Sequence, residues 1–488
     1  MIADSPQIKR TDNPSILIVG AGIGGLTLAI LLEKAGVQYE IFDRMAEIKP
    51  LGSALMLGSN VTPLFKQLGI YDEFISLARV VYSVDTLNEE REIEVPMPLA
   101  PIVEMGGHKN YIVTRSVLYD LLRRQIPAQK VHLGKRVLSF TQDEYGVELQ
   151  FSDGSVALGD VLVGADGAYS AVRQSLYKEL KKEGKLPSSD DGSLPFSCVC
   201  LVGQTKPLDP IQYPRLNKEY CEFNYVIGKD KPYSWATWTT RGNIYCWSVT
   251  LYLNKESSKD NDSFRNSEWG PEAATAMSKD VRDFPAVGEY LDNGLTIGNL
   301  IDNTPLVSKV MLEEKVFGTW YHERTVLLGD ACHKVHPASG SGAVNAIHDA
   351  VALANWLSVL NSNKVVHIER IFKEYRAERY PAALAAFASG QTLSKLRASG
   401  WKAAIARFIV RNLPLWLYKI MLKNLVAHRP QVSFLPLVDD SKGTLAAKHQ
   451  PSLEKTLAIH KKLEEKKAST PSVKTTSASA AVAAATAI

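Results

Sequence analysis

A glycine-rich turn between two short apolar segments constrains the fold of this chain more than any other feature. Residues 15–19 are a largely apolar run that predicts a buried strand, and the turn GAGIGG at residues 20–25 follows directly. Residues 26–35 predict a helix that ends at Gly36, and residues 39–42 predict a second strand that ends at Asp43. This order of strand, glycine turn, helix, strand and acid is typical of the βαβ unit that binds a dinucleotide.

Each glycine of this turn has a physical role in such a unit. Gly20 permits the tight turn, Gly22 lets the backbone approach a pyrophosphate, and Gly25 lets the helix pack close to the strand. Asp43 stands 18 residues after Gly25, where a carboxylate accepts hydrogen bonds from a ribose hydroxyl. We therefore predict that the first part of the chain binds an adenine dinucleotide, and the turn alone does not say which one.

Two further segments place an acid and glycines after a predicted buried strand. The first is Gly164-Ala-Asp166-Gly167, which precedes a helix predicted to start near Ser170. The second spans residues 325–357, where Gly329-Asp330 and a loop with several glycines lead into a long helical pattern. A glycine-rich loop that opens a helix offers backbone N–H groups and the positive end of the helix dipole to an anionic or electron-rich ligand. Taken alone, this segment is equally an ordinary strand–loop–helix connection.

The middle of the chain combines a basic helix start with an aromatic, strand-rich region. Residues 111–114 predict a strand, and residues 115–124 predict a helix capped by Thr114. Arg115, in its first turn, either reaches a phosphate or is an ordinary exposed helix residue.

Residues 196–253 predict an antiparallel sheet whose aromatic face suits a bulky apolar substrate. Most of its rings are expected to be core, and Tyr233 is a candidate polar group on the substrate side.

Composition and charge exclude several classes of protein. The chain has 14 Lys and Arg and 5 Asp and Glu from residue 401 onward, a net of +9, so the preceding 400 residues carry −5. The main body therefore gives no electrostatic indication of nucleic-acid binding. The five cysteines lack CxxC spacing, which indicates a reducing compartment and neither disulfides nor a metal site. The first 15 residues have no apolar core of signal-peptide length, so we expect a cytoplasmic protein that is not secreted.

The C-terminal region is basic and amphipathic. Residues 401–427 are apolar but interrupted by Lys and Arg, so they contain no uncharged span long enough to cross a bilayer. Two interpretations stay open: a helix pair that lies on a membrane surface, or a pair packed on the catalytic body. From about residue 464 the composition turns to Lys, Ser, Thr and Ala, which predicts a disordered tail.

The three glycine–acid segments together resemble the group A flavoprotein monooxygenases, the para-hydroxybenzoate hydroxylase-like family, and the long helical tail resembles its fungal natural-product branch. The resemblance runs from about Ser15 to Leu357. It implies an α/β fold in which a Rossmann-type FAD-binding domain is interleaved with an antiparallel-sheet substrate domain and followed by a helical C-terminal region. The expected boundaries are 14–80, 111–180 and 301–360 for the FAD-binding domain, 81–110 and 195–300 for the substrate domain, 361–430 for the helical region and 464–488 for the tail.

The resemblance also implies which residues hold FAD. The predicted set is Gly20, Gly22, Gly25, Asp43, Arg44, Ala54, Arg115, Asp166, Asp330, Gly342 and Ala343. Asp330 is expected beside the ribityl or pyrophosphate part, and the Gly342–Ala343 backbone beside the flavin ring. No second glycine fingerprint follows a strand, so NAD(P)H is expected to bind transiently.

The sequence departs from the family at several of these positions. The family often has Glu where Asp43 stands and Gln where Ser341 stands. It often has Asn where Val344 stands, and Asn345 lies one residue later, which turns it by about 100° on a helix. His333 matches a family position, where we expect a histidine that is satisfied within the loop.

The implied reaction is transfer of oxygen from a flavin hydroperoxide, formed with NAD(P)H and dioxygen, to a small apolar or aromatic substrate by epoxidation or hydroxylation. A flavin reductase or desaturase of the same fold is one alternative. A non-catalytic flavin-binding module is another. The sequence indicates neither the substrate nor an oligomeric state.

Overall fold

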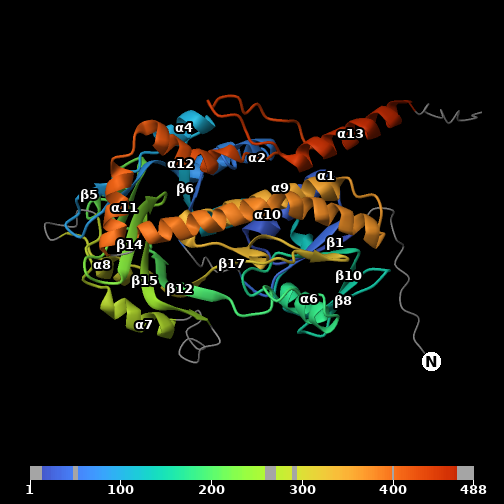
Figure 1. Cartoon of the computed structure of the whole chain (residues 1–488), viewed down its shortest axis with the longest axis horizontal. Helices are drawn as coiled ribbons and strands as arrows, with labels where there is room; N and C mark the ends of the chain where they lie inside the picture. The colour runs from blue at the N-terminus through green and yellow to red at the C-terminus, as the bar shows by residue number, and fades with distance from the viewer. Residues whose placement is uncertain (1–13, 48–52, 259–270, 288–293, 398–399, 470–488) are drawn as a thin grey trace, which may run out of the picture.

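A six-stranded sheet forms one half of the body in the computed structural model, which describes residues 14–47, 53–258, 271–287, 294–397 and 400–469 (Figure 1). Its strands run in the order β18-β19-β11-β1-β2-β7, and all neighbouring pairs are parallel except β18 with β19. The bounds are β1 (Ile16–Val19), β2 (Tyr39–Phe42), β7 (Val131–His132), β11 (Val161–Gly164), β18 (Tyr321–His322) and β19 (Thr325–Leu327). The inner strands β1 and β11 are buried throughout, as continuous apolar runs in a parallel sheet require.

Helices and a small sheet cover the two sides of this parallel sheet (Figure 1). Helices α1 (Ile23–Ala35) and α9 (Gly342–Ser358) lie on one side, next to α5 (Arg115–Arg123). The other side carries α6 (Ala171–Lys182) and the antiparallel strands β8 (Val137–Gln142), β9 (Val147–Phe151) and β10 (Val156–Gly159). Two predicted helix ends are confirmed: Gly36 closes α1 in a left-handed conformation, and Thr114 Oγ1 accepts from the Val117 N–H at the start of α5.

A nine-stranded sheet forms the second half of the body, in the order β16-β12-β15-β14-β13-β4-β6-β3, with β5 paired to β4. Its strands are β3 (Ala54–Leu57), β4 (Arg79–Leu87), β5 (Ile93–Val95), β6 (Asn110–Thr114), β12 (Pro195–Gln204), β13 (Tyr220–Ile227), β14 (Tyr233–Thr240), β15 (Ile244–Ser258) and β16 (Ser308–Glu313). It is mostly antiparallel, as predicted for residues 196–253, but β13 and β4 are parallel. Strands β3 and β6 join this sheet, although residues 54–57 and 111–114 were predicted within the FAD-binding domain.

Both faces of the large sheet are covered, each by its own hydrophobic core. Helices α7 (Pro271–Asp280) and α8 (Ile297–Asp302) cover one face, where Trp235, Trp247 and Tyr245 are buried. Helices α4 (Ala100–Gly106) and α12 (Leu415–Ala427) cover part of the other face, where Tyr225 and Trp238 are buried. Short helices α2 (Thr62–Gln67) and α3 (Tyr71–Leu77) pack on the core of the parallel sheet.

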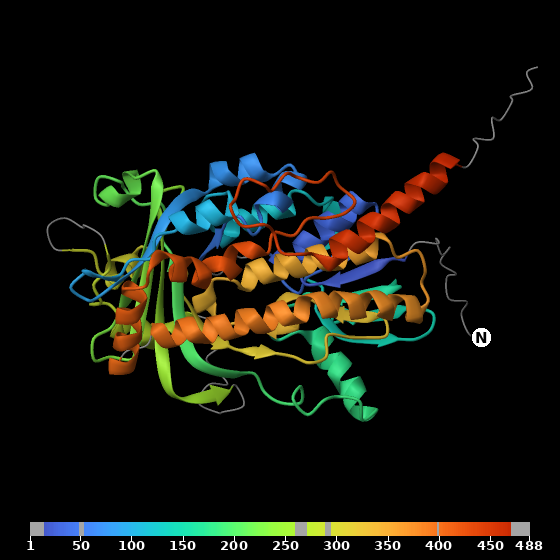
Figure 2. The same cartoon turned by 45° about the horizontal axis from the view of Figure 1, so that its top comes forward.

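The C-terminal helices connect the two halves. Helix α10 (Val365–Leu396) runs along the molecule from the parallel sheet to the large sheet and contains Pro381 (Figures 1 and 2). Helix α11 (Trp401–Arg411) follows at the large-sheet end, and α13 (Pro451–Ser469) projects at the other end. No helix within the described residues is both long enough and apolar enough to cross a bilayer. The tail predicted as disordered begins too early, because residues 464–469 continue α13; residues 470–488 lie outside the described residues.

The arrangement confirms the predicted fold class. A parallel sheet of Rossmann type, an interleaved large sheet and a helical C-terminal region are all present. The parallel sheet is built from strands that start at residues 16, 39, 131, 161 and 325, so the chain leaves it and returns to it several times.

Candidate active site

Four neighbouring parallel strands end at one edge of the six-stranded sheet, and a predicted site residue follows each. In the register of β2, β1, β11 and β19, Val19 lies opposite Phe42 and Gly164, and Gly164 lies opposite Leu327. Just beyond these ends stand Gly20, Asp43, Asp166 and Asp330. The structure therefore brings the three glycine–acid segments to one carboxyl edge, which is where open α/β sheets bind ligands.

The glycine turn after β1 has the close approaches that its sequence predicts. Gly20 has φ +107°, and a Cβ there would lie 2.4 Å from the carbonyl oxygen of Ala165. A Cβ on Gly25 would lie 1.9 Å from the carbonyl oxygen of Gly20. At Gly22, by contrast, a Cβ would meet nothing within 4 Å. Gly20 and Gly25 are thus needed by the fold itself, whereas Gly22 opens onto the space at the N-terminus of α1.

The carboxylate of Asp43 lies against this turn. Its Oδ2 accepts from the Ala21 N–H and its Oδ1 from the Met45 N–H, both at 2.8 Å. A carboxylate has further acceptor sites, so these two bonds fix its position and leave it able to accept from a ribose hydroxyl. The neighbouring Arg44 is exposed, and Ala54 opens β3, paired with Thr114 of β6.

Asp166 caps the N-terminus of α6. Its Oδ2 accepts from the backbone N–H groups of Ala171 at 2.6 Å and Val172 at 3.3 Å. Its Oδ1 is buried and has no partner within the described residues, and burial raises the pKa of this carboxyl. Arg173, which the sequence did not single out, joins this loop to the next one by donating to the carbonyl oxygens of Ala168 and Ala331.

Asp330 forms an ion pair with Lys334, and the charge of Arg115 lies nearby. The Lys334 ammonium lies 2.6 Å from Asp330 Oδ2, and the Asp330 side chain is one-third exposed at 33%. Desolvation acts to raise the pKa of Asp330, but the nearby charges of Lys334 and Arg115 bring it below its ordinary value. Arg115 is exposed at the start of α5. This position suits both a contact with a phosphate and an ordinary exposed helix residue. These residues place two cations and one anion beside the carboxyl edge.

The N-terminus of α9 lies beside the N-terminus of α1. A Cβ on Gly24 would lie 3.2 Å from Ala346 Cβ and 2.7 Å from Leu328 Cδ2, so small residues allow the two helices to approach. Gly342 and Ala343 form the first turn of α9, where the geometry of a helix leaves backbone N–H groups free. A Cβ on Gly342 would meet nothing closer than Val335, at 3.9 Å. Two positive helix ends therefore point to the same edge.

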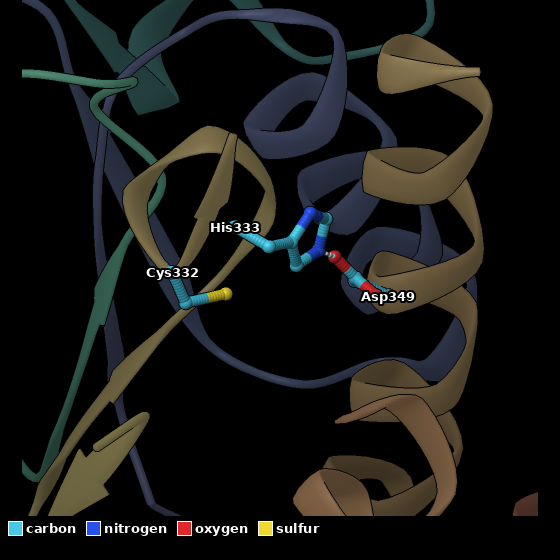
Figure 3. Close-up of side chains that lie close together, drawn as sticks. All are labelled: Cys332, His333 and Asp349. Carbon is cyan, nitrogen blue, oxygen red and sulfur yellow. Dashed lines mark hydrogen bonds and ion pairs between the residues drawn. The ribbon is translucent and has the colours of Figure 1, made fainter. Parts of the chain in front are cut away.

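A buried polar network fixes the loop that connects β19 to α9 (Figure 3). His333 Nε2 lies 2.6 Å from Asp349 Oδ2, which also accepts from the Gly329 N–H at 3.1 Å. Arg379 of α10 donates to Asp349 Oδ1 at 2.7 Å and to Asn345 Oδ1 at 3.1 Å. These charges bring the pKa of Asp349 down to about 2, although burial opposes ionisation. Asn345 therefore points to α10, and one ring nitrogen of His333, Nε2, is held by Asp349 of α9.

The same residues do not form a convincing metal site. The ligating atoms of Cys332, His333 and Asp349 lie within 4.8 Å of one another. However, both oxygens of Asp349 already accept from donors, and the Cys332 thiol donates to the Gly329 carbonyl at 3.4 Å. Burial raises the pKa of Cys332 well above its ordinary value, whereas a metal ligand must be a thiolate. We interpret the cluster as a hydrogen-bonded support for the loop.

Tyr233, the candidate polar group on the substrate side, lies on the face of the large sheet that α7 and α8 cover. Its ring packs edge to face on Phe284 at 5.3 Å, on the sheet face that α7 and α8 cover. It shares that face with Trp235, whose Nε1–H donates to the Pro285 carbonyl. Successive side chains of β14 point to opposite faces of the sheet, and both faces carry aromatic residues. The sequence of β14 therefore does not indicate which face of the sheet is nearer to the carboxyl edge of the parallel sheet.

A cluster of three hydroxyl groups lies on the opposite face. Tyr225 Oη is 2.5 Å from Ser234 Oγ and 3.3 Å from Tyr252 Oη, and Ser234 Oγ is 3.2 Å from Tyr252 Oη. Beside Tyr252 lies a small apolar cluster. Its buried members are Cys198, Cys200 and Leu312. The sequence showed these strands but not which residues share a face.

Helix α10 joins this face to the loop before α9. Ser394 Oγ lies 3.3 Å from His336 Nε2, directly before the loop glycines, and also contacts Cys198. Arg397, at the end of α10, lies over the Tyr225 ring at 4.3 Å. The hydroxyl and apolar clusters are thus on the sheet face that is turned toward the N-terminus of α9.

These residues fit a bound FAD molecule on three observations. Open space at Gly22 and Gly342 lies at two helix N-termini, where phosphate oxygens and an electron-rich ring are stabilised. Asp43 is held against the glycine turn with acceptor sites to spare. Finally, Asp166 Oδ1 and His333 Nδ1 are buried polar atoms without a partner within the described residues, as expected beside a polar ligand.

Comparison with known proteins gives a consistent result. A sequence family described as an FAD binding domain matches residues 13–200 and 271–389, more than half of the chain. The FAD-dependent monooxygenase ptmM of Penicillium ochrochloron is 28% identical over 398 residues, covering 79% of this chain and 90% of that protein. The FAD-dependent monooxygenase atmM of Aspergillus flavus is 26% identical over 444 residues, covering 87% and 88%. The crystal structure of Klebsiella pneumoniae HpxO complexed with FAD and uric acid shares the fold, with a TM-score of 0.62, 19% identity and coverage of 84% of this chain and 96% of that one.

Proposed function

The chain belongs to the FAD-binding domain family, and from this premise we propose that it is an FAD-dependent monooxygenase that uses NAD(P)H and dioxygen to epoxidise or hydroxylate an apolar natural-product intermediate. One observation carries the proposal. An apolar sheet face with a hydroxyl cluster is joined through α10 to the loop that opens α9, at the edge where the glycine–acid segments meet.

Bound FAD supplies the redox chemistry, since it accepts hydride from NAD(P)H and activates dioxygen. The chain's own residues bind and orient it. The N-terminus of α1, with Gly22, receives the pyrophosphate, and Asp43 accepts from the ribose. Asp330 and Arg115 lie on the other side of the edge, where Asp330 accepts from ribityl hydroxyls and Arg115 neutralises phosphate charge. Arg44, Ala54 and Asp166 complete the proposed contacts.

The first turn of α9 has an electrostatic role. Backbone N–H groups of Gly342 and Ala343 would stabilise negative charge on a flavin ring bound at this turn, in the way an oxyanion hole does. The His333–Asp349–Arg379 network holds this turn in place, so little reorganisation is needed when charge develops. NAD(P)H binds only transiently, because no second glycine fingerprint follows a strand.

The substrate side excludes water and orients the substrate. The buried residues Cys198, Cys200 and Leu312 provide an apolar wall, and water excluded from the site cannot divert the activated oxygen. Oxygen transfer to an alkene needs no acid–base residue. The hydroxyl groups of Tyr225, Ser234 and Tyr252 instead orient a polar group on an otherwise apolar substrate. The two relatives named above are FAD-dependent monooxygenases of Penicillium and Aspergillus, which supports the reaction class.

The test is oxygen incorporation by the purified protein. The FAD-loaded enzyme is expected to oxidise NAD(P)H faster when a polyketide, terpenoid or aromatic substrate is present, and to place one atom of labelled dioxygen in the product. Product without label would instead support the reductase or desaturase alternative. Protein that purifies without flavin and cannot be reconstituted would contradict the proposal.

A further inference from the structure

The outer surface of α11 and α12 is apolar. Nine of the 24 large hydrophobic side chains that are exposed in the described part of the chain lie between residues 401 and 425. They are Trp401, Ile405, Phe408, Ile409, Leu415, Trp416, Ile420, Met421 and Leu425, and we call them the α11–α12 patch. Four of them are more than 60% exposed. These are Trp401 at 70%, Phe408 at 69%, Trp416 at 62% and Ile420 at 61%. So many exposed apolar side chains on two consecutive helices indicate an interaction site.

The α11–α12 patch is separate from the face that α12 buries in the protein core. Helix α12 already buries Tyr418, Leu422 and Val426 in the core that it shares with α4, and the Tyr418 hydroxyl donates to the Pro98 carbonyl at 3.2 Å. Trp416 and Ile420 lie on the opposite side of the same helix, where a packed surface helix normally carries polar residues. Helix α11 buries no residue at all and is held by an ion pair of Arg407 with Glu94 at 3.2 Å.

The charged residues of the two helices themselves have a single sign. Residues 401–427 contain five Lys and Arg residues and no Asp or Glu. Arg407 and Lys419 pair with Glu94 and Glu104 of the body. The other three basic residues, Lys402, Arg411 and Lys423, are exposed beside the apolar side chains. Basic residues next to exposed Trp and Phe match a surface that is anionic outside and apolar just beneath.

We propose that the α11–α12 patch docks this protein on the surface of an anionic lipid membrane, with both helices lying in the plane of the interface. The apolar side chains enter the boundary between headgroups and acyl chains, while Lys402, Arg411 and Lys423 contact lipid phosphates. The charge favours lipid over a second copy of this chain, because two basic patches repel each other. Both views place these helices on the outside of the large-sheet end (Figures 1 and 2).

Docking in this orientation has a consequence for substrate supply, and this step alone rests on the proposed function. Helix α12 covers the same face of the large sheet that carries the hydroxyl cluster. The membrane therefore lies next to the substrate side of the molecule. An apolar substrate dissolved in the bilayer reaches the enzyme without crossing water.

Sedimentation with vesicles tests the proposal on the full-length, FAD-loaded protein. We expect it to sediment with phosphatidylcholine vesicles that contain phosphatidylserine, and less with phosphatidylcholine alone. A variant with Trp401→Ser, Phe408→Ser, Trp416→Ser and Ile420→Ser should lose more than about tenfold in partition coefficient. Lys402→Glu, Arg411→Glu and Lys423→Glu should each cost about fivefold on the anionic vesicles.

A matched control keeps the test specific. Leu138, Val156 and Leu158 are also exposed apolar residues, on the three-stranded sheet, and their replacement by Ser should leave sedimentation unchanged. Flavin absorbance in the pellet and supernatant shows that each variant is folded, and needs no catalytic activity. Equal sedimentation of the four-serine variant and the wild type would overturn the proposal, as would a wild type that binds neither vesicle. A patch that instead mediates dimerisation in light scattering, without vesicle binding, would also overturn it.

Discussion

His333 and Asp349 are joined by a 2.6 Å hydrogen bond in which both side chains are fully buried, at 1% and 0% exposure. The bond spans the loop between β19 and α9. Because Arg379 contacts the other oxygen of Asp349 at 2.7 Å, a single carboxylate ties that loop to two helices. The geometry of the proposed flavin turn therefore depends on a charge that lies outside it.

Removing that charge should destabilise the protein strongly. Asp349→Ala removes the counter-charge of the buried Arg379 guanidinium, which then keeps its hydrogen bond to Asn345 but no anionic partner in this network, and this costs about 3–5 kcal/mol in the free energy of unfolding. Urea unfolding measures the change. Glu374→Ala is the control, because it breaks an exposed pair with Lys455 and should cost less than about 1 kcal/mol. Similar losses in the two variants would show that the Asp349 network does not hold the loop.

Mild acid should destabilise the folded protein through its buried histidines. Burial lowers the pKa of His348 to about 3 and that of His336 to about 4, so the folded state binds fewer protons than the unfolded chain below about pH 6.5. Stability is thus present above that pH and is lost as pH falls toward these lower values. Each such histidine contributes a loss of about 1.4 kcal/mol per pH unit.

The free energy of unfolding of His348→Gln, measured at pH 7.5 and 5.5, gives the contribution of His348 to this pH dependence. The glutamine retains a donor for the Asn60 carbonyl, which lies 2.8 Å from His348 Nε2. The variant should show a shallower fall in stability with pH than the wild type. An unchanged slope would mean that His348 does not titrate differently in the two states.

Substitutions at two glycines of the turn after β1 should have different effects, one on FAD affinity and the other on the stability of the apoprotein. Gly22→Ala adds a methyl group where nothing lies within 4 Å, so the apoprotein should keep its stability while FAD affinity falls by tenfold or more, as an order of magnitude. Gly25→Ala places its methyl group on the Gly20 carbonyl and should cost about 1–3 kcal/mol in the apoprotein. Flavin fluorescence titration and thermal unfolding measure the two quantities. Unaltered FAD affinity in Gly22→Ala would argue against a pyrophosphate at this turn.

Tyrosines on opposite faces of the large sheet should differ in their effect on substrate. Tyr252→Phe removes one hydroxyl of the buried cluster and should raise KM several-fold or shift the site of oxygenation, because a group that orients substrate is lost. Tyr233→Phe alters only the α7 side and should leave kcat/KM unchanged. Steady-state kinetics and product analysis on both variants decide between the faces. The reverse pattern would place the substrate against α7.

Sequence reasoning succeeded where the determining interactions are local. The turn from Gly20 to Gly25, the Thr114 cap and the strand that leads into Asp330 each depend on neighbours within a few residues, so pattern and spacing predict them. The pairing of Asp349 with Arg379 depends on how α9 and α10 pack, which no local pattern encodes. The face on which Tyr233 lies could not be predicted for a related reason, since an aromatic strand that is buried on both faces has no polar side to set its orientation.

The four strand ends that meet at the carboxyl edge have a consequence for how the protein acquires its cofactor. They come from residues 19, 42, 164 and 327, so the edge exists only after more than three hundred residues have been synthesised and brought into register. Contacts of such long sequence separation form late and slowly in folding. Retention of flavin should therefore require that the entire fold has formed. Chains that are only partly folded lack the assembled carboxyl edge and should not bind flavin.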